Sequence, residues 1–219
     1  MKHIIQKMIN KADVILFDLD GTLIDTEKLY FRFWKEACAY YGFTMSDNNA
    51  LFMRSLDRET AIKYFNDISG GLLDYDQTRN KRIELMNDYF NSHDIEVKDG
   101  AKELLILLKE KGKKIYIVTA NKEEKAYSIL ARIGFVDLID GVISSKSVRR
   151  GKPYPDVYLK ACEIIKKPPQ EVVVFEDSPH GLKSAYDAGC FTVMVEDLSP
   201  YKDDMDYVNA HIKSLKEIT

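Results

Sequence analysis

The sequence predicts an α/β fold, a doubly wound and mostly parallel Rossmann-like sheet with a helical cap inserted after the first strand. Short apolar runs alternate with amphipathic helical segments along most of the chain, which is typical of βαβ units. Residues 27–98 interrupt this alternation and contain helical patterns without a convincing strand. The two observations together predict a core sheet and an inserted helical unit.

Five apolar runs are expected to be the strands of the core. Each is short, nearly continuous and rich in β-branched residues, as are strands buried on both faces of a parallel sheet. The runs are residues 14–17, 115–118, 141–144, 172–175 and 191–195.

The segments between these runs carry apolar residues at helical spacing. In the core the expected helices are residues 101–111, 123–133, 155–165 and 179–188, and in the insertion residues 27–41, 57–65 and 78–90. We therefore expect a catalytic core of residues 1–26 and 99–219 and a cap of residues 27–98. An insertion that leaves the carboxyl end of the first strand is expected to act as a lid, because ligands of open α/β sheets bind beyond the strand carboxyl ends.

Composition excludes several classes of function. The 219 residues are 45% hydrophobic and 31% charged, with a net charge of −3 and no broad basic face, so nucleic acid is not an expected partner. No apolar segment is long enough to span a membrane. Cys38, Cys162 and Cys190 lack metal-ligand spacing and are expected to be buried free thiols in a reducing cytoplasm. The oligomeric state stays open.

The first strand ends in two acids, Asp18 and Asp20. Residues i and i+2 of a strand point to the same side, so both carboxylates are expected to converge on one spot. Like charges that close are unfavourable without a cation or a shared proton. The pair therefore predicts a site that binds a divalent metal and attacks an electrophile.

Polar residues also follow the next three strands. Thr119, Ala120 and Asn121 offer a hydroxyl and backbone N–H groups at a helix start, a good environment for a phosphoryl oxygen. Lys152 lies between two turn-forming residues after the third strand, and the fourth strand ends in Glu176-Asp177. All of these groups are expected at one edge of the sheet.

These residues carry a specific resemblance to a known family. The segments Asp18-Leu19-Asp20-Gly21-Thr22, Val118-Thr119-Ala120-Asn121, Gly151-Lys152-Pro153 and Phe175-Glu176-Asp177-Ser178 resemble the four ordered motifs of haloacid dehalogenase-like phosphohydrolases. The helical insertion resembles the cap of the β-phosphoglucomutase-like branch. The resemblance covers residues 14 to about 195, and the opening dozen residues and the tail after Asp197 add nothing to it.

The resemblance implies a magnesium-dependent phosphatase that acts on a small phosphorylated metabolite through an aspartyl phosphate. Asp18 is the implied nucleophile and Asp20 the general acid and base. The implied ligands of Mg²⁺ are Asp18, the Asp20 backbone carbonyl and Asp177, with Glu176 either binding the metal or orienting a metal-bound water. The phosphoryl group is expected to be bound by Lys152, Thr119 and the N–H groups near Ala120 and Asn121.

Two alternatives stay open at this point. A β-phosphoglucomutase-like sugar phosphomutase shares the same core, but it carries a histidine where this chain has Tyr30. Arg58 resembles the cap arginine that binds the mutase's second phosphate, although it is equally well explained as an exposed arginine near a helix start. A phosphoacceptor signalling module is the more distant alternative, since such modules are about half this length and lack a lid.

Overall fold

The computed structural model describes residues 1–53, 56 and 58–219, and it confirms the predicted α/β architecture. In this part of the chain six strands form one parallel sheet in the order β3-β2-β1-β4-β5-β6. The strands are β1 (Val14–Phe17), β2 (Lys114–Thr119), β3 (Gly141–Ser144), β4 (Val172–Glu176), β5 (Phe191–Val195) and β6 (Ala210–Ile212).

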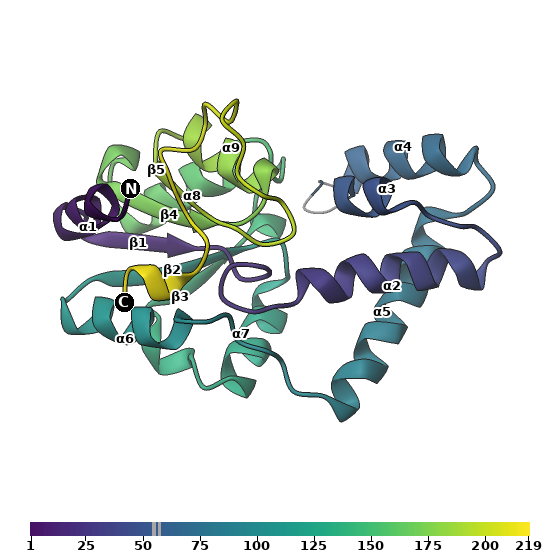
Figure 1. Cartoon of the computed structure of the whole chain (residues 1–219), viewed down its shortest axis with the longest axis horizontal. Helices are drawn as coiled ribbons and strands as arrows, with labels where there is room; N and C mark the ends of the chain where they lie inside the picture. The colour runs from purple at the N-terminus through teal and green to yellow at the C-terminus, as the bar shows by residue number, and fades with distance from the viewer. Residues whose placement is uncertain (54–55, 57) are drawn as a thin grey trace. The chain divides into compact units, whose positions relative to one another are not determined.

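Helices cover both faces of this sheet (Figure 1). One face carries α6 (Ala101–Glu110) and α7 (Glu123–Arg132), and the other carries α8 (Asp156–Ile165) and α9 (Pro179–Asp187). This division follows from right-handed crossovers, because the chain moves outward from β1 to β3 and then returns to β4 and β5. Short 3₁₀ helices complete the unit at η1 (Val136–Leu138), η2 (Ser145–Ser147), η3 (Pro169–Glu171) and η4 (Leu215–Glu217).

The point where the strand order reverses lies between β1 and β4. Phe17 pairs with Ile117 on one side and with Phe175 on the other. The rings of Phe17 and Phe175 stack with their centroids 4.8 Å apart. The carboxyl ends of β1, β2 and β4 are therefore neighbours, and a crevice at such a switch point is the usual ligand site of this architecture.

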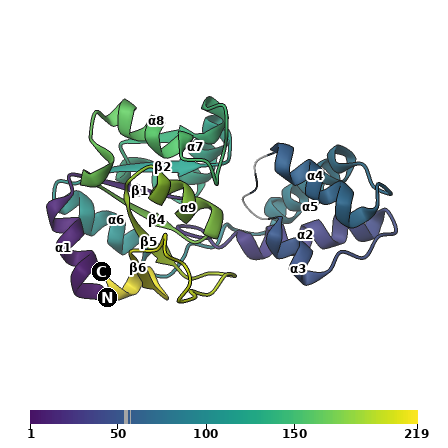
Figure 2. The ribbon, with the colours of Figure 1, turned by 90° about the horizontal axis from the view of Figure 1, so that it is seen from above.

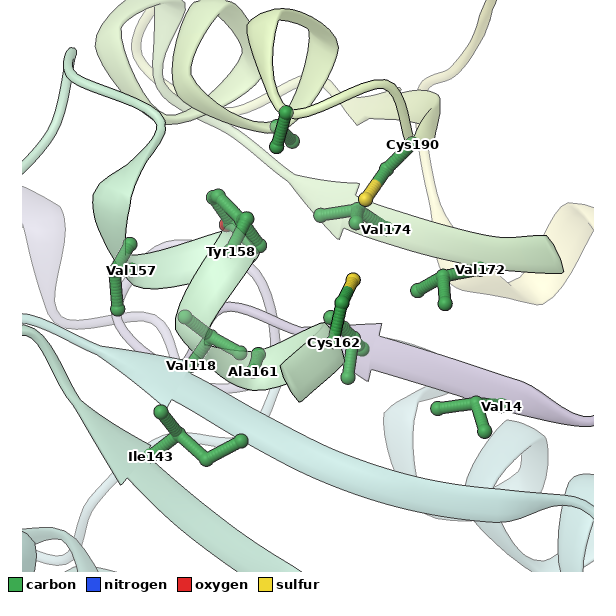
Figure 3. Close-up of a cluster of buried hydrophobic side chains, with 13 residues drawn as sticks. Val14, Val118, Ile143, Val157, Tyr158, Ala161, Cys162, Val172, Val174 and Cys190 are labelled. Atoms are coloured by element: carbon green, nitrogen blue, oxygen red, sulfur yellow. The ribbon is translucent and has the colours of Figure 1, made fainter. Parts of the chain in front are cut away.

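A large buried cluster lies between the sheet and the helices α8 and α9 (Figure 3). Its members come from four strands and two helices, and they include Val14, Val118, Ile143, Val157, Tyr158, Ala161, Cys162, Val172, Val174 and Cys190. All three cysteines of the chain are buried and free, as predicted. The cluster holds the switch-point strands against α8, which carries the largest of these side chains, Tyr158.

The insertion forms a compact helical unit, Thr26–Ile95, while Met1–Asp25 and Glu96–Thr219 form the other unit. Its helices are α2 (Glu27–Tyr40), α3 (Asp47–Phe52), α4 (Arg58–Ser69) and α5 (Tyr75–Ser92). Trp34 packs on Phe65 and Tyr75, with ring centroids 5.8 Å and 5.7 Å away. The predicted start of the second cap helix, Asp57, lies outside the described residues.

The two connections between the units are paired with each other. Ile24 and Val97 form an antiparallel bridge, and the Asp25 N–H donates to the Glu96 carbonyl at 2.8 Å. Lys98 adds an ion pair with Asp197, in which Nζ lies 2.8 Å from Oδ1. The two connections are thereby paired with each other, and the second is also linked to the segment that follows β5.

Besides the short 3₁₀ helices, two α-helices and one strand were not predicted. These are α3, the helix α1 (Lys2–Lys11) and the edge strand β6. The N-terminal and C-terminal segments lie side by side (Figure 2), and the Gln6 side chain donates to the Ile218 carbonyl at 2.9 Å. A three-residue strand shows too little alternation to be recognised in sequence, and its position depends on pairing with β5. Among the helices described, none is long and apolar enough to cross a membrane.

We expect Gly100→Ala to destabilise the α/β unit strongly. Gly100 is the N-cap residue of α6 with φ of +82°, and an added Cβ would lie 2.3 Å from the backbone nitrogen of Lys216. Left-handed strain and a clash with backbone should together lower the free energy of unfolding by about 3 kcal/mol. Gly112→Ala is the matched control, since φ is +70° there and nothing lies within 4 Å of the added Cβ. Equal urea midpoints for the two variants would contradict the assigned contact.

Candidate active site

Asp18 lies directly after β1, at the switch point. Its backbone N–H donates to the Phe175 carbonyl at 2.9 Å, which extends the β1–β4 pairing by one bond. Its side chain is buried. The strand itself ends at Phe17, so strand alternation does not place Asp18 and Asp20, contrary to the reasoning used for the prediction. The turn that follows places them, with Leu23 and Ile24 both donating to the Leu19 carbonyl.

Lys152 connects the ends of β1 and β4. Its Nζ donates to Oδ1 of Asp18 at 2.6 Å and also to Oε1 of Glu176. Only 5% of the Lys152 side chain is exposed. The structure therefore brings together the predicted nucleophile, the predicted phosphate-binding lysine and the first acid of the second pair.

The acids that end β4 are also buried. Oε2 of Glu176 accepts from the backbone N–H and the hydroxyl of Ser178, each at 3.1 Å. Asp177 accepts a hydrogen bond on Oδ1 from the Thr22 hydroxyl, at 3.2 Å. Both carboxylates are fixed by the loops that follow β1 and β4.

Asp18, Glu176 and Asp177 form a cluster that fits a cation. Each offers a carboxylate oxygen, and the three oxygens lie within 4.8 Å of one another. Three buried carboxylates face one buried ammonium, so the group has an excess of negative charge that a divalent ion would balance. An all-oxygen donor set suits a hard cation such as Mg²⁺. Asp20 does not belong to this side-chain cluster, and its predicted contribution through the backbone carbonyl stays a prediction.

The pKa values of Asp18 and Lys152 show the same imbalance. Burial raises the pKa of the Asp18 carboxyl to about 8, with a further contribution from Glu176, and Lys152 opposes this only in part. Burial lowers the pKa of Lys152, but Asp18 and Glu176 outweigh it and hold the pKa well above its ordinary value. Both shifts reflect buried negative charge, and a divalent cation at this cluster would favour the ionised form of Asp18.

The segment after β2 contacts Asp20. The Asn121 side-chain amide donates to Oδ2 of Asp20 at 2.6 Å, and the Asn121 backbone N–H donates to the buried Thr119 hydroxyl at 3.1 Å. Ser144 holds the Asn121 carbonyl through a 2.6 Å hydrogen bond. The prediction concerned only backbone donors at Ala120 and Asn121. The contact between the Asn121 side chain and Asp20 was missed, because a motif does not show which way an amide turns.

Arg58 lies in the helical unit, at the start of α4. Its Nη2 pairs with Oδ2 of Asp76 at 2.6 Å, and its guanidinium lies 5.9 Å from the centroid of the Tyr75 ring. The side chain is exposed, and its ion pair with Asp76 lies at the protein surface. A role in substrate binding stays a prediction.

Tyr158 is the residue of this region that sequence reasoning did not identify. Its hydroxyl donates to Oε1 of Glu176 at 3.2 Å. In the sequence it occupies an apolar position of a helix, where nothing distinguishes it from a core aromatic residue.

Comparison with known proteins identifies the family of this chain. The family model described as haloacid dehalogenase-like hydrolase matches residues 15–195. The chain is 31% identical over 184 residues to the validoxylamine A 7'-phosphate phosphatase of Streptomyces hygroscopicus subsp. limoneus, covering 82% of this chain and 84% of that protein. It is 29% identical over 178 residues to the phosphorylated carbohydrates phosphatase of Thermotoga maritima, covering 81% and 82%.

A mutase is also among the relatives. The chain is 25% identical over 187 residues to the β-phosphoglucomutase of Bacillus subtilis, covering 83% of this chain and 82% of that protein. Among solved structures, a family IA hydrolase from Entamoeba histolytica has a TM-score of 0.79 at 24% identity, covering 94% of this chain and 95% of that one. At this identity the likeness concerns the fold.

Mg²⁺ is expected to bind the protein without substrate and to raise its melting temperature, because the ion stabilises only the folded cluster. Asp177→Asn should weaken this binding about 10-fold or more, since it removes a charged ligand. Asp187→Asn is the matched control, because Asp187 forms an exposed ion pair with Lys183 on α9. Isothermal titration of both variants measures the difference, and equal Mg²⁺ affinities would exclude Asp177 as a ligand.

Proposed function

Because this chain belongs to the haloacid dehalogenase-like hydrolases, we propose that it is a magnesium-dependent phosphatase that hydrolyses a small phosphorylated sugar or related metabolite. The observation that carries the proposal is the buried Asp18 carboxylate at the switch point, with the Lys152 ammonium 2.6 Å away and the second acid pair beside it. Nucleophile, cation and counter-charges are the parts that phosphoryl transfer requires.

In the first step an oxygen of Asp18 forms a bond to phosphorus while the bond from phosphorus to the substrate oxygen breaks. Asp20 protonates that leaving oxygen. In the second step Asp20 takes a proton from water, and the water oxygen attacks phosphorus and releases the Asp18 carboxylate with inorganic phosphate. The hydrogen bond from Asn121 to Asp20 supports this role, since it orients the Asp20 carboxylate.

Lys152 and Thr119 stabilise the charge on the transferred group. Lys152 is already desolvated, so its charge acts through a medium of low polarity and needs little reorganisation during the reaction. Mg²⁺ held by Asp18, the Asp20 carbonyl and Asp177 would neutralise phosphoryl oxygens, and Glu176 would place a further negative charge beside the ion. The N–H groups near Ala120 and Asn121 complete the proposed set.

Residues 27–98 are proposed to act as the lid. The chain passes between the α/β unit and the helical unit at two connections that pair near Ile24 and Val97, so a small rotation there would move the helical unit as one body. Closure of a lid excludes bulk water and selects the substrate. Tyr30 and Arg58 belong to this unit.

A sugar phosphomutase is the second candidate, supported by the relative of that name. A mutase must protect its aspartyl phosphate from water until the bound sugar has reoriented and can accept the phosphate. The histidine that assists in the mutase is replaced here by Tyr30, whose ring lies 4.8 Å from the guanidinium of Arg82. This substitution favours hydrolysis.

Activity should be found in a panel of phosphorylated sugars and polyols assayed with Mg²⁺. Treatment with EDTA should abolish phosphate release, and Mg²⁺ should restore it whereas Ca²⁺ should not, because Ca²⁺ requires more ligands at longer distances. Full activity in EDTA would sink the proposal of a metal-dependent phosphatase.

Variants at Asp18 and Asp20 should separate the two carboxylate roles. Asp18→Asn should abolish the phosphoenzyme that a quenched reaction with ³²P-labelled substrate detects. Asp20→Asn should lower turnover by about 10²–10⁴-fold, the usual contribution of general acid–base catalysis, while the phosphoenzyme can still form. Small and equal losses for both variants would contradict the assignment.

Arg58→Ala should distinguish a bound distal anion from a surface ion pair. If Arg58 binds a second acidic group of the substrate equally in ground and transition states, KM should rise about 10-fold with kcat little changed. Arg32→Ala is the control, because Arg32 forms an exposed pair with Glu36 in the same helical unit. Isomerisation of a hexose 1-phosphate, primed by a hexose bisphosphate and faster than phosphate release, would replace the hydrolase proposal with the mutase.

A further inference from the structure

We propose that Tyr158 is a positioning residue for the phosphoryl transfer, because its hydroxyl fixes Glu176 and thereby holds the Lys152 ammonium beside Asp18. The inference rests on the proposed function. It concerns a residue that none of the four motifs contains.

The ring and the hydroxyl of Tyr158 have different surroundings. The ring packs in the apolar cluster between α8 and the sheet, beside Val118, Ala161 and Cys162 (Figure 3). The hydroxyl reaches the polar end of β4 and donates to Oε1 of Glu176 at 3.2 Å. A phenylalanine would fill the same apolar space, so packing alone does not require the oxygen. The hydroxyl therefore calls for an explanation beyond packing, and its hydrogen bond to Glu176 supplies one.

Glu176 is held from several elements at once. Oε1 accepts from Lys152 and Tyr158, and Oε2 accepts twice from Ser178. These four hydrogen bonds match the roughly four lone-pair sites of a carboxylate. The backbone of α9 closes the remaining side, since a Cβ on Gly181 would lie 1.8 Å from Oε1. Glu176 thus has one orientation, and Tyr158 supplies one of the contacts that determine it.

Lys152 depends on that orientation. A lysine side chain has a flexible four-carbon stem, so the position of its charge is set by the groups around the ammonium. Here those groups are Asp18 at 2.6 Å, the Val118 carbonyl at 3.4 Å and Glu176. The Tyr158 ring, with its centroid 5.5 Å from Nζ, is a further neighbour that Tyr158→Phe would keep. Asp18 loses its negative charge when one of its oxygens bonds to phosphorus. Glu176 is then the charged anchor that remains, so its orientation decides where the ammonium lies during the reaction.

The loss of the hydroxyl should therefore affect the transition state more than substrate binding. Charge on the transferred group is stabilised best when the ammonium is already in place, and a freely turning Glu176 would add reorganisation to the chemical step. Tyr158→Phe should lower kcat about 10-fold, the size expected for one hydrogen bond to a charged group, with KM changed by less than about twofold.

A purely structural role predicts a different pattern. Cys162 lies one turn further along α8 in the same cluster and contacts none of the proposed catalytic groups in the described structure, so Cys162→Ala is the matched control. It should lower the melting temperature at least as much as Tyr158→Phe while leaving kcat within about twofold. A kcat for Tyr158→Phe within twofold of the wild type, or a loss no larger than that of Cys162→Ala, would overturn the proposal.

A second readout does not depend on turnover. The Lys152 ammonium is buried and hydrogen-bonded, so its protons should exchange slowly enough to give a ¹H–¹⁵N side-chain signal, identified by its absence in Lys152→Arg. This signal should be lost in Tyr158→Phe and kept in Cys162→Ala. An unchanged signal in Tyr158→Phe would reject the positioning role. Failure of the wild type to hydrolyse any phosphoester would instead reject the proposed function, and the two failures are thereby distinguished.

Discussion

The ammonium of Lys152 between the carboxylates of Asp18 and Glu176 is the interaction on which the rest of the site depends. Three carboxylates are buried at the carboxyl ends of β1 and β4, where each charge has lost most of its water. Such a group is stable only if the charges are paired and hydrogen-bonded. Lys152 supplies one positive charge from a different loop. Burial, with a smaller contribution from Glu176, raises the pKa of Asp18, and the remaining negative charge makes the cluster fit a divalent ion.

The sheet topology makes this interaction possible. Asp18 and Lys152 are 134 residues apart in the chain, and they meet because β1 is flanked by β2 and β4. Parallel strands present their carboxyl ends at one edge, and the reversal of strand order separates the helices there. The buried cluster under α8 also contains Tyr158, and its packing brings the Tyr158 hydroxyl within hydrogen-bond distance of Glu176.

The two units contribute unequally to the functional conclusion. The α/β unit contains the contacts described among the proposed catalytic residues, and the proposed reaction rests on those contacts. The helical unit contains Tyr30 and Arg58, which we propose influence the choice between phosphatase and mutase and the choice of substrate. Overall similarity does not separate the two activities, because phosphatases and a mutase both align over four-fifths of this chain.

The five core strands and the acids that follow β1 and β4 were predictable because buried parallel strands and paired acids are local patterns. The edge strand β6 and the helix α1 were not, because their stability comes from contacts between the chain ends and the sheet. The motifs likewise identified Asp18, Lys152 and Glu176 as site residues, but they did not show which of these side chains contact one another. Whether Asn121 turns to Asp20, and whether a core tyrosine reaches Glu176, depends on side-chain directions set by packing between distant segments. Sequence thus determined which groups lie at the sheet edge, and tertiary structure decided which of them hold one another, because hydrogen bonding among buried charges is a property of three-dimensional position.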